Sequence, residues 1–193
     1  MARPSKKELR SEEILDACER SIVQFGVAGA TLQRVADESG LARPLLHHYV
    51  GNREDLIAAV VVRFTERAMA EDAAFKQHLP DKHRTRAAIQ LLFDPRYASS
   101  SHDIQLFQAL MVAAEEQAEL KVVLAGWYQA FVDDMEAMLS ADFPRVTASA
   151  RRAVATGIVA LYFNADSMAS LVSPQPLFKD SKQAALQLLE TMQ

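Results

Sequence analysis

Cysteine is almost absent from this sequence of 193 residues, which contains Cys18 alone. A single cysteine excludes a disulfide within the chain and favours a reducing compartment. Glycine and proline are also scarce, at six and seven residues, which favours helices over a turn-rich β-sandwich. No apolar run follows the basic start at residues 1–8, so no signal peptide is predicted, and the apolar stretches 57–62 and 157–163 are too short to cross a bilayer. We therefore expect a cytoplasmic protein with no membrane partner.

Positive charge is not in excess. The formal net charge is −4, which by itself argues mildly against a nucleic-acid partner. Residues 1–56 hold eight basic and nine acidic side chains, and four of those bases, Arg3, Lys6, Lys7 and Arg10, fall in the first ten residues. This clustering predicts a basic N-terminal arm, residues 1–10, that touches DNA phosphates or a minor groove. A solvated terminal tail is the alternative interpretation.

Apolar residues recur at helical spacing along almost the whole chain, and no segment has the alternation of a β-strand. The sequence therefore predicts an all-α fold. The expected helices, about nine of them, cover residues 11–25, 32–39, 42–49, 53–77, 81–94, 102–116, 119–141, 148–172 and 177–192. The predicted N-caps are Ser11, Thr31, Asn52 and Thr147.

The segment from Thr31 to Leu56 is the most informative. It predicts two short helices joined by a tight turn at Gly40, where glycine tolerates the positive φ that such turns require. A small shared core is expected from Leu32, Val35, Ala36, Leu41, Leu46 and Val50. The side chains left more exposed are Gln33, Arg34, Arg43, Leu45, His47, His48 and Tyr49, which are types that read base edges or donate to phosphates. An ordinary helix pair with no DNA partner remains open on periodicity alone.

The same residues resemble the helix-turn-helix of the TetR family of bacterial regulators over about residues 11–60. The matching positions are Phe25-Gly26, Thr31, Val35-Ala36, Gly40-Leu41, Leu46-His47-His48-Tyr49-Val50, Arg53 and Leu56. The chain departs from the family pattern at four positions. His47 stands where Tyr is usual, Val50 where Phe is usual, Arg53 where Lys is usual, and Ala42 where a capping Ser or Thr is usual.

The resemblance implies a role for each of these positions. The third helix would be the recognition helix in the major groove. Arg43 and His48 would read base edges, Pro44 and Leu45 would contact a thymine methyl, and Gln33 would reach a base from the second helix. Thr31, His47, Tyr49 and Arg53 would hold phosphates. The expected domains are a DNA-binding domain over residues 1–56 and a helical ligand-sensing and dimerisation domain over residues 57–193.

The eighth expected helix is apolar on all sides over residues 153–163, which is typical of a helix buried all round. The ninth carries a second apolar stripe of Ala184, Ala185, Leu188, Leu189 and Met192. The resemblance implies that these last two helices form a homodimer interface. An intramolecular core role for the eighth helix is the alternative.

A ligand cavity is likewise implied by the resemblance and not by spacing. Its candidate lining consists of Phe107, Met111, Trp127, Tyr128, Phe131, Met135, Tyr162, Asn164 and Asp166. An aromatic and methionine-rich lining favours an apolar or amphipathic small molecule. Plain core packing is the alternative interpretation for each of these residues.

Enzyme signatures are missing: there is no dinucleotide loop, P-loop, nucleophile elbow or zinc-protease motif. His78 and His83 are poorly spaced for one helical metal site, and Cys18 is expected to be an inert core residue. We therefore predict a transcriptional regulator, not an enzyme, with no cofactor and no metal. Its dimer would bind a palindromic operator with two recognition helices about 34–36 Å apart, and a ligand that shifts the fourth helix would release it. The main rival is a helical interaction protein with a vestigial helix-turn-helix.

Overall fold

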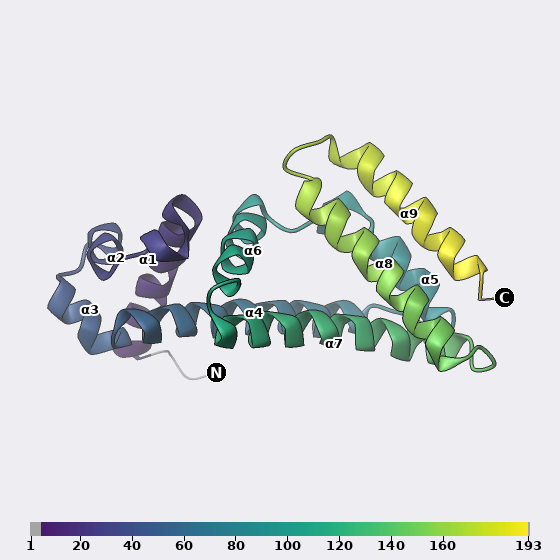
Figure 1. Cartoon of the computed structure of the whole chain (residues 1–193), viewed down its shortest axis with the longest axis horizontal. Helices are drawn as coiled ribbons and strands as arrows, with labels where there is room; N and C mark the ends of the chain where they lie inside the picture. The colour runs from purple at the N-terminus through teal and green to yellow at the C-terminus, as the bar shows by residue number, and fades with distance from the viewer. Residues whose placement is uncertain (1–4, 193) are drawn as a thin grey trace. The chain divides into compact units, whose positions relative to one another are not determined.

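The computed structural model describes residues 5–192, and its regular elements over that range are all helices, with no strand. The elements of the described chain are α1 (Lys6–Gly29), α2 (Leu32–Ser39), α3 (Arg43–Val50), α4 (Arg53–Gln77), α5 (Arg84–Leu92), the short 3₁₀ helix η1 (Pro95–Tyr97), α6 (Ser101–Ala114), α7 (Ala118–Asp142), α8 (Ala148–Met168) and α9 (Pro174–Glu190) (Figure 1). The predicted all-α class with nine α-helices is confirmed for these residues.

Packing divides the chain into two compact units. Unit 1 contains Met1–Met69 and Gln105–Leu124, and unit 2 contains Ala70–Ile104 and Ala125–Gln193. The helices α4, α6 and α7 each contribute residues to both units. The expected boundary between residues 56 and 57 falls inside unit 1, and the division into a DNA-binding and a sensing domain stays a prediction.

The first helix begins earlier than the apolar pattern predicts, at Lys6 instead of after Ser11. Ser5 forms a capping box, in which its hydroxyl accepts from the Glu8 amide at 3.2 Å and its own amide donates to the Glu8 carboxylate at 2.6 Å. These hydrogen bonds hold the pKa of Glu8 below its ordinary value. The expected start at Ser11 was wrong because residues 6–10 are mostly charged and show no apolar period, although they extend the helix.

Near its end, α1 is interrupted at Gly26, whose φ of 70° and ψ of 168° lie in a region open essentially to glycine alone. The chain then turns into α2, whose N-cap Thr31 accepts from the Arg34 amide at 3.3 Å. Gly40 ends α2 with a φ of 68°, as the predicted turn requires. Ala42 caps α3 with no side-chain hydrogen bond, as its departure from the family pattern suggests.

Unit 1 has one apolar core. Val35, Ala36 and Leu46 are buried, and the other three residues of the expected core are partly buried against them. From α1 and α4 the core receives Ile14, Ala17, Cys18, Ile22, Leu56, Val60 and Phe64, and from α6 and the first turns of α7 it receives Leu106, Leu110, Leu120 and Leu124. Phe64 stacks on Phe107 with ring centroids 6.0 Å apart. The helix-turn-helix is thus supported by α1, α4 and α6 together.

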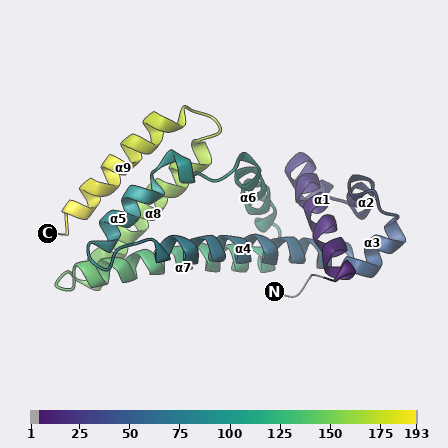
Figure 2. The ribbon, with the colours of Figure 1, turned by 180° about the vertical axis from the view of Figure 1, so that it is seen from behind.

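In unit 2, α8 and α9 lie side by side along most of their length (Figures 1 and 2). They approach closely at Gly157, where an added Cβ would lie 2.9 Å from a methyl of Leu188. The N-cap Thr147 starts α8 as predicted, and Pro174 opens α9 three residues before the expected start. Asp142 accepts from the amides of Arg84 and Thr85 and so closes the N-terminus of α5.

One face of α8 stays outside this core. Val154, Ala155, Ile158 and Val159 are buried within unit 2, whereas Ala153, Thr156, Ala160 and Asn164 are exposed. The exposed positions recur every three or four residues and therefore form a continuous stripe of mostly small side chains. Within residues 5–192, no helix has the length and apolar character needed to span a membrane.

Candidate nucleic-acid interface

The outer face of α3 carries five of the predicted site residues. Arg43, Pro44, Leu45, His47 and His48 are all exposed, while Leu46 between them is fully buried. Residues 43 and 47 lie one turn apart, as do residues 44 and 48, so these four side chains share one surface of the helix. The buried Leu46 fixes the rotation of α3 and thereby turns this surface outward.

A shallow hollow marks the same surface. It has a volume of about 550 Å³ and is lined by Leu32, Arg43, Pro44, His47 and His48. Among residues 5–192 the Arg43 guanidinium has no hydrogen-bond or ion-pair partner. Its five N–H donors are therefore free for an external acceptor.

Tyr49 is less exposed than the sequence predicts. Its ring is partly buried against the core of unit 1 and makes an edge contact with the ring of His48, at 5.4 Å between centroids. The contact helps to set the orientation of the His48 imidazole. The Tyr49 side chain thus contacts both the core and the exposed face of α3.

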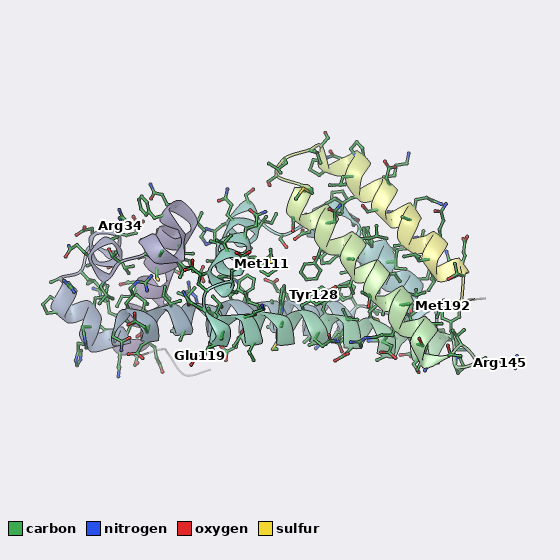
Figure 3. All side chains as sticks on the ribbon, viewed as in Figure 1. Arg34, Met111, Glu119, Tyr128, Arg145 and Met192 are labelled. Carbon is green, nitrogen blue, oxygen red and sulfur yellow. The ribbon has the colours of Figure 1, made fainter. Side chains whose placement is uncertain are left out.

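The predicted residues on α2 are exposed but are already engaged. The Thr31 oxygen accepts the Arg34 amide, which leaves its hydroxyl hydrogen available, and Gln33 donates to the Asp37 carboxylate at 2.8 Å. Arg34 donates to the carbonyl of Gly29 at 2.7 Å, and its guanidinium lies 4.4 Å from the centre of the Phe25 ring (Figure 3). These contacts hold the first turn of α2 against the end of α1.

Arg53 opens α4, but its side chain turns back toward α1. Its Nε donates to the carbonyl of Ala30 at 3.2 Å, and its Nη2 donates to the carbonyl of Val27. Both carbonyls lie at the C-terminal end of α1, where a positive charge is favoured by the helix dipole. The guanidinium that was predicted to hold a phosphate therefore fastens α4 to the end of α1.

The basic residues that precede the interface are helical. Lys6, Lys7 and Arg10 are exposed on the first turns of α1, and Arg10 pairs with Glu13 at 2.5 Å. Arg3 lies outside the described residues. Whether residues 1–10 act as a DNA-contacting arm stays a prediction.

An ion-pair cluster between α1 and α4, centred on the buried Glu19, was not anticipated. Glu19 is only 3% exposed, and its carboxylate lies 2.8 Å from Nη2 of Arg63. The same guanidinium reaches Asp16 at 2.8 Å and Glu12 at 3.0 Å. Burial alone would lower the pKa of Arg63, but its hydrogen bonds to Glu19, Glu12 and Asp16 raise it above the ordinary value. The spacing of the three acids at positions 12, 16 and 19, on one face of a helix, was the available signal.

Unit 2 contains an aromatic cluster that includes several of the predicted pocket residues. Phe163 makes edge contacts with Trp127, Tyr128 and Phe131, with centroids 5.4–5.7 Å apart. Figure 3 labels Tyr128 on α7. Phe131 also stacks on Tyr162 at 5.8 Å. Phe163 joins α7 to α8 in this cluster and was missing from the predicted set, although it follows Tyr162 directly in the sequence.

The remaining predicted pocket residues have different surroundings. Met135 is buried in the core of unit 2 and Asn164 is exposed, whereas Phe107 and Met111 belong to unit 1. Asp166 accepts from the Ser99 amide at 2.9 Å. Burial, reinforced by the nearby charge of Asp166, raises the pKa of the Tyr162 hydroxyl, so this group stays neutral and keeps its proton.

No group of three or more His, Cys, Asp or Glu side chains in the described part of the chain is arranged to hold a metal. Cys18 is fully buried, as predicted. Burial and the neighbouring Glu19 raise the pKa of its thiol to about 12.

Comparison with known families assigns the helix-turn-helix. Residues 14–60, from the first buried residue of α1 into α4, match the family described as bacterial regulatory proteins, tetR family. Over these residues the chain is similar to the TetR family. The predicted resemblance to the TetR family is thereby confirmed, and the matched segment includes the residues of the helix-turn-helix and Arg53 that were predicted to contact DNA, but not the basic residues 1–10.

The likeness to curated relatives extends beyond the helix-turn-helix. The HTH-type transcriptional regulator BetI of Brucella canis is 31% identical over 127 residues, which cover 64% of this chain and 63% of the relative. BetI of Burkholderia thailandensis is 30% identical over 103 residues, covering 52% of each chain. The chain thus spans less than two thirds of the length of the curated relatives it matches. These relatives are named as regulators and not as enzymes.

Solved structures agree with the fold of the whole chain. A TetR transcription regulator from Haloarcula marismortui superposes with a TM-score of 0.73 at 20% identity, covering 95% of this chain and 97% of the other. A transcriptional regulator from Rhodococcus sp. Rha1 superposes with a TM-score of 0.72 at 16% identity, covering 94% and 96%. At these identities the likeness concerns the fold, which is the one expected for a TetR-family protein.

Proposed function

We propose that this chain is a sequence-specific DNA-binding transcriptional regulator. In this proposal it acts in the cytoplasm as a homodimer that represses from a palindromic operator and is released by an apolar or amphipathic small molecule. The observation that carries the proposal is the outward face of α3, where Arg43, which has no partner among residues 5–192, lies beside two histidines in a shallow hollow. The TetR-family match over residues 14–60 gives this face its context.

The residues that contact DNA in this proposal form two groups, one for the bases and one for the phosphates. Arg43 and His48 read base edges, and an Arg–guanine pair of hydrogen bonds discriminates by about 1–3 kcal/mol. Pro44 and Leu45 contact a thymine methyl. Gln33 reaches a base once it releases Asp37. The phosphate contacts come from Thr31, which keeps a hydroxyl hydrogen to donate, from His47 and Tyr49, and from the donors of Arg53 that are not bonded to Val27 and Ala30.

Dimerisation through α8 and α9 is supported by the exposed stripe of α8. Ala153, Thr156 and Ala160 are small, so the backbone of a second α8 can approach closely, and four helices would then bury the stripe. Twofold symmetry would place two copies of α3 about one DNA turn apart, which matches a palindromic site.

The effector site is proposed within the aromatic cluster around Phe131, Tyr162 and Phe163. These partly buried rings, of which Phe131 stacks on Tyr162 and meets Phe163 edge to face, offer apolar surface, and Asp166 lies close enough to raise the Tyr162 pKa. Helix α4 links this region to the helix-turn-helix along one continuous backbone. A ligand that favours a displaced α4 would weaken operator binding in proportion to its differential affinity.

The test is selection of duplex DNA from a random library, followed by binding at two salt concentrations. Wild type should enrich a palindrome and bind it more weakly at higher salt. Arg43→Ala should relax specificity at one base pair of each half-site. Arg145 is exposed and lies outside the helix-turn-helix, so Arg145→Ala should leave both the affinity and the specificity unchanged. The regulator proposal fails if no sequence is enriched and the amount of DNA that the protein binds does not depend on salt. The alternative, a helical interaction protein, would then take its place.

A further inference from the structure

The connection between α1 and α4 is unusual because it is made with buried charge. Glu19 faces the core side of α1 and is almost completely buried, and Arg63, whose side chain is 17% exposed, lies against it. Burying an ion pair costs solvation energy, and apolar residues of the same size are often equally stable in its place. An ion pair differs from an apolar contact because it fixes the direction in which two helices meet.

The contacts of Arg63 are arranged so that they oppose sliding of α4 along α1. Its Nη1 contacts Asp16 at 2.8 Å and Glu12 at 3.0 Å, while Nε donates to Glu19 at 3.1 Å. The three carboxylates cover two turns of α1. Sliding α4 along α1 in either direction would break contacts at one end of this row, and Arg67 gives a second charge 3.7 Å from Glu19.

Arg53 repeats the connection at the other end of the same helix pair. Its guanidinium donates to the carbonyls of Val27 and Ala30, after the Gly26 interruption. Arg53 and Arg63 are ten residues apart on α4, which corresponds to about 15 Å of helix. The first half of α4 is therefore fastened to α1 at two separated points, with the helices antiparallel.

We propose that Arg63 is a positioning residue that makes α1 and the first half of α4 move as one body. The effect of this positioning on DNA binding rests on the proposed function. Since α2 and α3 pack on α1, a rigid α1–α4 pair fixes the direction in which the recognition helix is presented from α4. Arg63 touches neither base nor phosphate, and it acts through the orientation of α3.

The first measurement is hydrogen exchange on the free full-length protein, which needs no DNA. Arg63→Gln should speed exchange of the backbone amides of residues 11–25 by about tenfold or more, because local opening of α1 becomes easier. Arg20→Gln is the matched control, because Arg20 forms an exposed pair with Glu38 between α1 and α2. Unchanged exchange in Arg63→Gln would overturn the inference whether or not the protein reads DNA.

The second measurement separates positioning from stability. The double variant Glu19→Leu with Arg63→Met replaces the central buried ion pair with an apolar contact. Its melting temperature should therefore be close to that of wild type. Its preference for the selected operator over random duplex should still fall by about tenfold, with binding to random duplex unchanged. A double variant that retains the full preference would show that the cluster only stabilises the fold.

Arg63→Lys provides a variant that keeps the charge if the double variant does not fold. One ammonium cannot meet three carboxylates in the fixed fork geometry of a guanidinium. The operator preference should therefore drop by about threefold while the protein stays folded, and an unaltered preference would contradict the inference. If wild type itself enriches no sequence, the proposed function has failed, and hydrogen exchange alone decides whether α1 and α4 form one body.

Discussion

At the scale of single residues, the candidate interface contains two arginines with opposite roles. Arg43 is exposed and unpartnered within the described chain, whereas Arg53 donates to two backbone carbonyls at the end of α1. Sequence alone could not separate them, because both are arginines to which the family resemblance gave a contact with DNA. Their difference comes from the path of α1 beyond Gly26, which brings Val27 and Ala30 within reach of α4.

The two arginines should therefore respond differently to substitution. Arg53→Met should lower the melting temperature by about 3–8 °C, since it leaves two carbonyls without charge-assisted hydrogen bonds. Arg43→Ala should leave the melting temperature within about 1 °C of wild type, since nothing in the described chain depends on it. Scanning calorimetry of both variants checks this, and an equal loss in the two would refute the assignment.

Cys18 should be chemically silent in the folded protein. Burial raises the pKa of its thiol to about 12, so almost no thiolate is present at pH 8, and its side chain is fully buried. A thiol reagent such as dithionitrobenzoate should find no reactive group in native protein and one group per chain after denaturation. Rapid labelling of native protein at pH 8 would mean that α1 opens readily.

At the scale of elements, the sequence predicted helices best where a polar cap and an apolar face coincide. The bounds of α2 agree with the prediction at both ends, since Thr31 caps it and Gly40 stops it. The start of α1 was missed because the charged residues 6–10 have no apolar face to reveal. The start of α9 was missed because Pro174 was interpreted as part of a turn, although it suits the first turn of a helix.

The interruption of α1 gives a matched pair of glycine substitutions. Gly26→Ala should lower the melting temperature by about 3–8 °C, because its backbone conformation is closed to alanine although the space around it is open. Gly126→Ala, in the middle of α7 and equally unobstructed, should raise it by about 1–3 °C through helix propensity. Thermal denaturation decides, and a neutral Gly26→Ala would mean that α1 can continue straight through residue 26.

At the scale of the whole molecule, the sequence identified the contributing helices but not their contacts. The aromatic residues of α7 and α8 were predicted to lie near one another, and within unit 2 they do. Phe107 and Met111 were grouped with them because all have the same chemistry, yet they belong to unit 1. Helical periodicity shows which face of a helix is buried, but it does not show which partner covers that face.

The exposed stripe of α8 predicts the oligomeric state. Ala160→Glu should convert the proposed dimer into a monomer, because it would place two carboxylates within a symmetric interface in a stripe of small, uncharged side chains. Ala130→Glu, an exposed position on α7, is the control and should leave the dimer intact. Light scattering during size-exclusion chromatography gives the mass directly, and a dimeric Ala160→Glu variant would place the interface elsewhere.

Because the thiol of Cys18 is buried, the motion of the proposed recognition helices can be observed with a spin label. A protein whose native cysteine does not react can receive a spin label at a chosen surface site without first being made cysteine-free. In a symmetric dimer, one introduced cysteine such as Gln33→Cys supplies two labels, one beside each recognition helix. The distance between them would then report, in solution, whether the two helices lie one DNA turn apart and how far a ligand separates them.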